Sequence, residues 1–228
     1  MRGFLLHARP FQEHGLLLDW LTDTGGWVRM RQRGGRRVSK KGQNRPPSFV
    51  CLELQTAGRG GWPVLRSAEP IEAFRFLQGR RLASAFYLHE LTLRALRPDE
   101  PVPGLFLDYW KSLAMLDEPE MPLSVVIRRF ERRLLDHLGA GIDWRRTSAG
   151  TPVEAAGRYR VSPGGGIVAD GRADAIPGDV ILAIADDRPL EEPSQRRLAR
   201  DLMQGLLSPH VGAAPFVSRR LWQTGESG

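Results

Sequence analysis

The sequence predicts an α+β fold in which a small antiparallel β-barrel precedes an α-helical part. Apolar residues follow the short runs and alternation of strands up to about residue 75, and helical spacing after it. The excess positive charge is confined to the strand-rich part. Residues 1–70 hold twelve Arg or Lys and five Asp or Glu, which accounts for the whole formal net charge of +7. With 41% hydrophobic residues, the chain can bury a substantial core.

Five short segments are predicted to be strands. Residues 4–9 form an apolar run that Pro10 is expected to end, and residues 15–22 form a second run of strand length. A turn signal separates this run from residues 27–33, where Val28 and Met30 alternate with arginines and are expected to face the core. The last two strands are expected at 49–54 and 63–66. Short strands with glycine-rich turns between them are typical of a small barrel.

Four segments after residue 75 show the helical spacing of apolar residues: 80–96, 103–116, 123–138 and 193–207. The segment 140–190 is rich in turn residues, and a β-hairpin is expected near 158–185, around Tyr159 and three consecutive glycines. We therefore expect a nucleic-acid-binding barrel domain over residues 1–75 and a helical domain over residues 76–228.

The strongest functional signal is the stretch 29–45, which carries eight cations and no anion. Cations in such number repel each other unless a polyanion neutralises them, and nucleic acid is the commonest polyanion. A solvated charged loop is the alternative interpretation. The DNA-binding candidates are Arg29, Arg31, Arg33, Arg36, Arg37, Lys40, Lys41 and Arg45.

Aromatic residues near this stretch could stack on bases. The four candidates are Trp20, Trp27, Phe49 and Trp62. Core packing is the expected role for most of them, with about one left exposed as a stacking platform. A barrel face that presents cations and such a ring could follow a nucleic-acid backbone and stack its bases.

The predicted helix 123–138 carries arginines beside an apolar stripe. Arg128 and Arg132 lie one turn apart, next to Phe130 and Leu134. Such a helix could bind a short acidic peptide with an aromatic end, because the cations bind carboxylates and the stripe accommodates the ring. Ordinary surface arginines are the alternative, which spacing alone favours. The four residues named here are the partner-binding candidates.

The sequence contains no recognisable catalytic or metal-binding set. The five histidines are scattered, and neither a GxSxG nucleophile motif nor a phosphate-binding glycine motif is present. Cys51 is the only cysteine, so neither an intrachain disulfide nor a cysteine zinc site is expected. We expect no catalytic residue, no metal and no cofactor. The single cysteine fits a reducing cytosol, and no apolar run approaches the ~20 residues of a membrane span.

An ordered set of motifs along the chain resembles the RecO family of bacterial recombination mediators. Each motif is weak alone, whereas the set covers nearly the whole chain. The similar segments are 4–13, 18–22, 25–29, Gly34-Gly35-Arg36-Arg37, Leu65-Arg66-Ser67-Ala68-Glu69, Tyr87-Leu88-His89-Glu90-Leu91, Leu105-Phe106-Leu107-Asp108-Tyr109, the segment 128–139 that begins Arg-Arg-Phe-Glu, and Ser218-Arg219 with Leu221.

The resemblance implies an OB-fold in the N-terminal barrel and a role in DNA repair through the RecF pathway. It implies binding of single- and double-stranded DNA, annealing of complementary strands, and contact with RecR. It also implies contact with the acidic C-terminal tail of single-stranded DNA-binding protein, which helps RecA load onto coated strands. Because the family's tail-binding pocket lies at the motif that Arg128 opens, the resemblance favours the partner-binding interpretation of that helix.

Some members of the family hold zinc with four cysteines, but residues 144–149 contain no cysteine where that site would begin. The chain therefore resembles the zinc-free branch. We expect a non-enzymatic, cytoplasmic, nucleoid-associated DNA-binding mediator without membrane contact. Two alternatives remain. A metal-dependent DNA-processing enzyme would cleave DNA when magnesium is added, and an RNA- or ribosome-surface protein would prefer structured RNA to single-stranded DNA.

Overall fold

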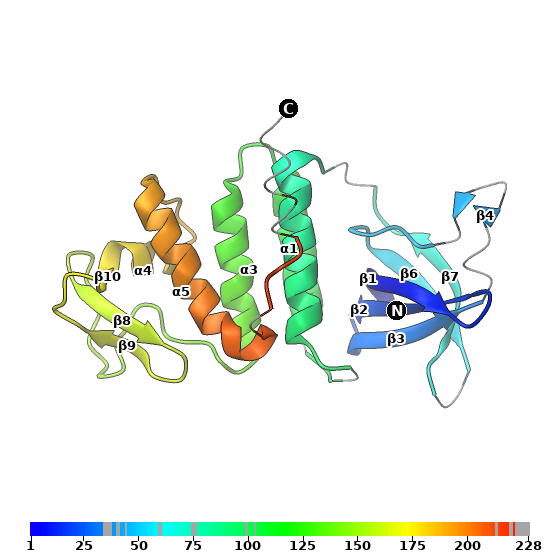
Figure 1. The fold of residues 1–228 in the computed structure, drawn as a ribbon, viewed down its shortest axis with the longest axis horizontal. Helices are drawn as coiled ribbons and strands as arrows, with labels where there is room; N and C mark the ends of the chain where they lie inside the picture. The colour runs from blue at the N-terminus through cyan, green and yellow to red at the C-terminus, as the bar shows by residue number, and fades with distance from the viewer. Residues whose placement is uncertain are drawn as a thin grey trace. The chain divides into compact units, whose positions relative to one another are not determined.

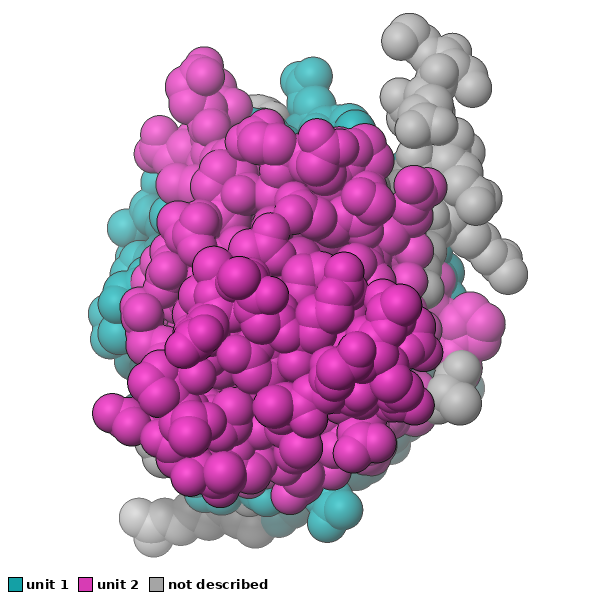
Figure 2. Space-filling model, turned by 90° about the vertical axis from the view of Figure 1, so that its left-hand side faces the viewer, with its two compact units in different colours: residues 1–117, 217–228 teal, residues 118–216 magenta. Residues whose placement is uncertain are grey.

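The computed structural model describes residues 1–33, 38–39, 42–43, 45–58, 61–73, 77–98, 100–102, 104–212, 214–218 and 221. The chain forms two compact units, one of residues 1–117 with 217–228 and one of residues 118–216 (Figure 2). The first unit contains a closed β-barrel and two helices, and the second contains three helices and a small sheet (Figure 1). The predicted α+β class is confirmed.

Five strands close the barrel in the order β1-β2-β3-β7-β6 (Figure 1). They are β1 (Arg2–Phe11), β2 (Gly15–Thr22), β3 (Gly26–Gln32), β6 (Leu52–Ala57) and β7 (Val64–Pro70). Neighbouring strands are antiparallel except β3 and β7, which run parallel where Arg31 faces Val64. A short hairpin of β4 (Val38–Ser39) and β5 (Gly42–Gln43) follows β3 in the chain. This closed order of five strands has the topology of an OB-fold.

Apolar side chains from alternate strand positions fill the barrel. Leu18 and Trp20 of β2 and Met30 of β3 are fully buried in one cluster, and Val28 packs against it. The alternation predicted for residues 27–33 is therefore confirmed. Because successive side chains of a strand point to opposite faces, the arginines of β3 lie on the outside of the barrel.

Strand β1 continues through Pro10 to Phe11, so the predicted break at the proline is wrong. Pro10 pairs with Leu16 of β2, whereas β1 pairs with β6 only through Arg2 and Gly3 among the described residues. Pro10 therefore lies where one side of β1 has no adjacent strand. A proline is tolerated at such an edge, because its missing N–H is not needed there.

Two helices pack against the outer face of β1 within the first unit. They are α1 (Gly79–Ala95) and α2 (Leu105–Asp117). The centroid of the Phe4 ring lies 5.3 Å from the ring centroid of Phe106 and 5.1 Å from that of Tyr109. His89 of α1 donates from Nε2 to the Leu6 carbonyl and accepts at Nδ1 from the Tyr109 hydroxyl, at 3.0 Å. These contacts explain why the compact unit extends to residue 117, beyond the boundary expected near 75.

The second unit contains the helices α3 (Leu123–His137), α4 (Gly178–Ala185) and α5 (Pro193–Val211) and the strands β8 (Arg158–Ser162), β9 (Gly166–Ala169) and β10 (Ile176–Pro177). The hairpin of β8 and β9 lies in the turn-rich segment where one is expected. Helix α3 packs against both α4 and α5. No helix among the described residues has the length and apolar character needed to cross a membrane.

Helix α4 has no counterpart in the sequence prediction. Its apolar run has no polar face, because Val180, Ile181, Ala183 and Ile184 are all buried. A short segment buried on nearly every side shows no helical period, so periodicity alone cannot distinguish it from a strand. The other four helices begin and end close to their predicted bounds.

Candidate nucleic-acid interface

The outer face of β3 carries part of the basic stretch. Arg29 and Arg31 occupy alternate positions of the strand, and Arg33 follows its end. Arg33 is exposed and the other two are half-buried. Arg45 is also exposed, but it does not line the hollow beside β3. The remaining DNA-binding candidates, Arg36, Arg37, Lys40 and Lys41, lie outside the described residues.

The charge of Arg29 is compensated by an acid that the sequence places ten residues away. Asp19 of β2 faces Arg29 across the antiparallel pair, and Arg29 Nε lies 2.6 Å from Asp19 Oδ1. The Asp19 side chain is only 5% exposed, so the ion pair is shielded from water. The prediction that no anion neutralises the cations of the stretch 29–45 is therefore wrong for Arg29. The geometry makes Arg29 a fixed support of this face.

Two tryptophans and a phenylalanine surround that support. The guanidinium carbon of Arg29 lies 5.4 Å from the ring centroid of Trp27 and 5.8 Å from that of Trp62. The Trp62 ring meets the Phe11 ring at 5.9 Å and an interplanar angle of 71°. Arg31 Nε donates to the Trp62 carbonyl at 3.3 Å. Cations and aromatic rings thus share one face of the barrel.

The four aromatic candidates differ in exposure. Trp20 and Phe49 are buried, and Trp27 is half-buried. Trp62 keeps 41% of its surface exposed. This distribution agrees with the expectation that most of the four pack in the core and about one is exposed.

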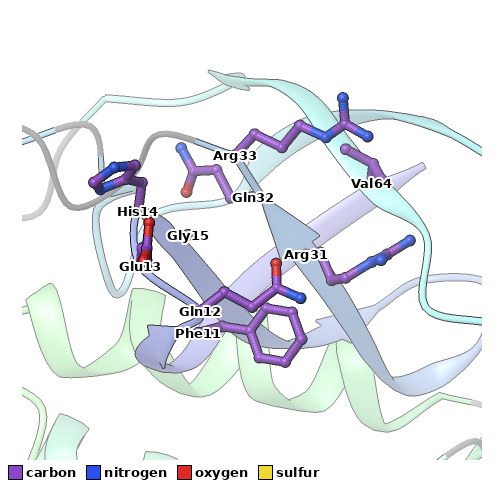
Figure 3. Close-up of a pocket in the computed structure, with 9 residues that line it drawn as sticks. All are labelled: Phe11, Gln12, Glu13, His14, Gly15, Arg31, Gln32, Arg33 and Val64. Atoms are coloured by element: carbon purple, nitrogen blue, oxygen red, sulfur yellow. The ribbon is translucent and has the colours of Figure 1, made fainter.

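The barrel surface is hollowed beside the Phe11 ring (Figure 3). An open hollow of about 480 Å³ lies between the β1–β2 turn, the end of β3 and the start of β7. In Figure 3 the side chains of Arg31 and Arg33 extend in the same direction, with Val64 between them. Phe11 lines the same hollow from the end of β1. The volume falls within the range of small-ligand sites, about 300–1,000 Å³. Cations at its rim suit an anionic ligand such as a nucleic-acid backbone.

A second charged depression lies in the unit of residues 118–216. It is a narrow groove of about 20 Å³ between α3, α4 and α5, and its apolar lining includes Val125, Ile184 and Ala199. The cations around it are Arg128, Arg188 and Arg196, and the acid is Asp187. Arginines around a narrow apolar floor suit a carboxylate attached to an apolar group.

The structure separates the four partner-binding candidates. Arg128 lines the groove, and its Nη1 lies 2.5 Å from the buried Glu131 carboxylate. Arg132 instead pairs with Asp187 at 2.8 Å. Phe130 and Leu134 are fully buried, so the apolar stripe packs in the core and does not present a surface to a partner. The expectation of direct contact through these two residues is therefore corrected. An apolar stripe on a helix has the same pattern whether it faces the core or a partner.

Sequence reasoning missed three residues of these sites: Asp19, Arg188 and Arg196. Asp19 could have been noticed as the only charged residue in the apolar run 15–22. Arg188 follows α4, in a segment that looks like a solvated turn when that helix is not predicted. Arg196 lies in α5, where the sequence predicts a helix but gives this arginine no role. No group of at least three His, Cys, Asp or Glu side chains suited to a metal ion occurs in the part of the chain that the structure describes.

Comparison with known proteins gives one consistent result. Residues 77–220 match the family model described as Recombination protein O C terminal. The chain is 35% identical over 224 residues to DNA repair protein RecO of Photobacterium profundum, an alignment that covers 97% of this chain and 94% of the relative. It is 35% identical over 227 residues to DNA repair protein RecO of Vibrio cholerae, covering 97% and 92%, and 33% identical over 225 residues to that of Aliivibrio salmonicida, covering 97% and 94%.

Proposed function

The chain belongs to the RecO family of DNA repair proteins, and from that premise we propose that its barrel binds DNA and anneals complementary strands. We extend the proposal to loading of RecA onto strands coated with single-stranded DNA-binding protein. The observation that carries it is the barrel face on which Arg31 and Arg33 lie beside the exposed Trp62. Annealing requires neutralisation of two strands at once, which a cationic surface supplies without a catalytic residue.

Arg31 and Arg33 are the described cations best placed to bind phosphates, because they line the hollow and Arg29 is already paired with Asp19. Cations two positions apart in a strand are about 7 Å apart along it. Contacts to phosphates do not depend on the base sequence or on base pairing, so such a surface can bind both single and double strands.

The test is the double variant Arg31→Ala/Arg33→Ala, titrated with single-stranded and duplex DNA at several salt concentrations. Binding to both ligands should weaken. The slope of log affinity against log salt should become shallower by about 1.4 for single strands, for two lost phosphate contacts. Arg197→Ala/Arg200→Ala, at two exposed arginines of α5, is the charge-matched control. Unchanged affinity and slope in the double variant would contradict the proposed DNA surface.

For the second half of the proposal, the groove lined by Arg128, Arg188 and Arg196 accepts the acidic C-terminal tail of single-stranded DNA-binding protein. Arg128 is 15% exposed and its Nη1 already faces Glu131, so the terminal carboxylate would bind the remaining N–H donors of its guanidinium. An apolar tail residue would lie on Val125 and Ile184. A charge-assisted hydrogen bond in such a partly apolar site contributes about 1.5–3 kcal/mol.

Titration of a fluorescent tail peptide tests this site. Arg128→Ala should weaken peptide binding about tenfold or more, by the same hydrogen-bond energy, while bare-DNA binding stays unchanged. Arg133→Ala is the surface control, because Arg133 lies on the same helix, is 46% exposed and does not line the groove. Arg128→Ala also removes a charge partner of the buried Glu131, so thermal unfolding of both variants shows whether the fold is intact. Equal peptide affinities for wild type and Arg128→Ala would place the tail site elsewhere.

The remaining partners stay part of the proposal without an assigned surface. These are RecR and the other components of the RecF pathway, with the cytoplasm and nucleoid as the place of action. Incubating the protein with DNA and magnesium distinguishes a mediator from a DNA-processing enzyme, because only the enzyme releases cleavage products. Competition between structured RNA and single-stranded DNA distinguishes it from an RNA-surface protein.

A further inference from the structure

Trp62 differs from the other large aromatic residues near the basic face. It lies on the short connection that enters β7 and keeps 41% of its surface exposed, whereas Trp20 and Phe49 are buried. An exposed indole offers a flat apolar surface on which a ligand can stack. Its neighbours are the arginines of the proposed DNA surface, which indicates what kind of ligand covers it.

Trp62 is held in place by three contacts from two strands, β1 and β3, two of them to its ring and one to its backbone. Arg29 places its guanidinium 5.8 Å from the ring centroid and is itself anchored to the buried Asp19. Phe11 at the end of β1 meets the ring at 5.9 Å. Arg31 binds the backbone carbonyl of Trp62 at 3.3 Å. A ring fixed in this way loses little conformational entropy when a ligand stacks on it.

The same contacts place the ring beside the phosphate-binding cations. Arg31 touches Trp62 and also lines the hollow, together with Arg33 and Phe11 (Figure 3). A single strand laid over Arg31 and Arg33 would therefore carry its bases next to an exposed aromatic surface. Every base has a π-face, so stacking of this kind tolerates any sequence.

We infer that Trp62, supported by Phe11 and Arg29, is a base-stacking subsite for an unpaired base of single-stranded nucleic acid. This inference rests on the proposed DNA binding by the barrel and adds a means of discrimination. The cations bind the backbone of single strands and duplexes alike, whereas the ring binds only a base that is free of its own stack. Trp62 thus gives the barrel a preference for single strands.

The experiment compares Trp62→Ala and Trp62→Phe with wild type on three ligands: a single-stranded oligonucleotide, the same strand in a duplex, and a strand of equal length built from abasic sites. Trp62→Ala should weaken binding of the normal single strand at least about fivefold, the lower bound for one stacked base. Trp62→Phe should recover most of that loss. Duplex and abasic-strand affinities should change less than about twofold, because neither ligand offers a free base.

A second readout does not depend on affinity. Saturating single-stranded DNA should quench tryptophan fluorescence in wild type more than in Trp62→Phe, because a stacked base quenches the indole. Thermal unfolding of each variant shows whether the substitution damages the fold. Equal losses for all three ligands would overturn the inference and reduce Trp62 to a support for Arg29 and Arg31. Unchanged single-strand affinity in Trp62→Ala would also overturn it.

Failure of the inference is distinguishable from failure of the proposed function. If Arg31→Ala/Arg33→Ala weakens both single-strand and duplex binding while Trp62→Ala weakens neither, the barrel is the DNA surface and the stacking subsite is wrong. If the arginine variant also has no effect, the DNA surface lies elsewhere on the chain.

Discussion

Single side chains join the barrel to its helices. His89 is buried between the Leu6 carbonyl and the Tyr109 hydroxyl. Burial lowers the pKa of His89 from 6.5 to about 4, although its hydrogen bond to Leu6 acts in the opposite direction. The imidazole is therefore neutral at pH 7 and carries its proton on Nε2. Protonation would put a second proton on Nδ1, where Tyr109 now donates.

The stability of the first unit should depend on pH through this histidine. A lowered pKa in the folded state means that the contribution is fully present above pH 6.5 and is lost as the pH falls from 6.5 toward 4. By pH 4.5 the loss should reach about 2.5 kcal/mol. Urea unfolding at pH 7.5 and 4.5 measures it. The difference between the two pH values should be smaller for His89→Gln, and equal differences would contradict the assignment.

A second residue-scale prediction concerns the turn between β2 and β3. Gly26 has φ +62°, and a Cβ there would lie 2.7 Å from the Glu100 carbonyl oxygen. Gly61 has the same φ with open space around it. Gly61→Ala should lower the free energy of unfolding by about 1–2 kcal/mol from backbone strain alone. Gly26→Ala should lower it by about 2 kcal/mol more, because the methyl group meets backbone atoms that cannot move aside easily.

At the scale of elements, the loop after α3 is held by its own hydrogen bonds. The Thr147 and Thr151 hydroxyls are 2.7 Å apart, and Thr147 N donates to the Thr151 carbonyl at 2.8 Å. Ser148 N donates to the Ile167 carbonyl of β9, and Trp144 is buried. The main chain thus ties the loop to the β8–β9 hairpin, and its threonine, serine and tryptophan side chains do not favour zinc.

Chelation should therefore leave the protein folded. Addition of a strong chelator should not lower the unfolding temperature or the DNA affinity, and elemental analysis should find no stoichiometric zinc. Thr147→Val, which removes the buried hydroxyl bond, should lower the free energy of unfolding by about 1 kcal/mol. A chelator-induced loss of folding would show that a metal holds this loop or another part of the chain.

At the scale of the whole molecule, the net charge is confined to one part of the chain. The whole net charge of +7 lies in residues 1–70, while residues 71–228 carry equal numbers of acids and bases. The groove of Arg128 lies in the unit of residues 118–216, and the hollow of Arg31 lies in the other unit. Binding of DNA and binding of an acidic tail are therefore expected to depend on separate residues.

Annealing assays should show this separation. On bare complementary strands, Arg31→Ala/Arg33→Ala should slow annealing and Arg128→Ala should not. On coated strands at subsaturating protein, both variants should be slower, Arg128→Ala by about tenfold, the energy of one charge-assisted hydrogen bond. Removing the acidic tail from the coating protein should bring wild type down to the rate of Arg128→Ala. Slower annealing of bare strands by Arg128→Ala would contradict the division.

The sequence by itself determined the elements and the place of the charge. Strands and helices follow from local period, so the alternation at Val28 and Met30 and the helix at 123–138 could be predicted from neighbouring residues. Neighbouring residues could not predict that a strand continues through Pro10 or that residues 178–185 form a helix. The first depends on whether the strand has a neighbour on that side, and the second is too buried to show a polar face.

Tertiary structure decided which candidate residues are paired, buried or accessible. Strand register put Asp19 opposite Arg29 and converted a candidate phosphate ligand into a support for Trp62. Packing of α3 against α4 and α5 buried Phe130 and left Arg128 at a groove. The physical reason is that burial and ion pairing depend on residues distant in the chain, whereas period and composition are properties of a local segment.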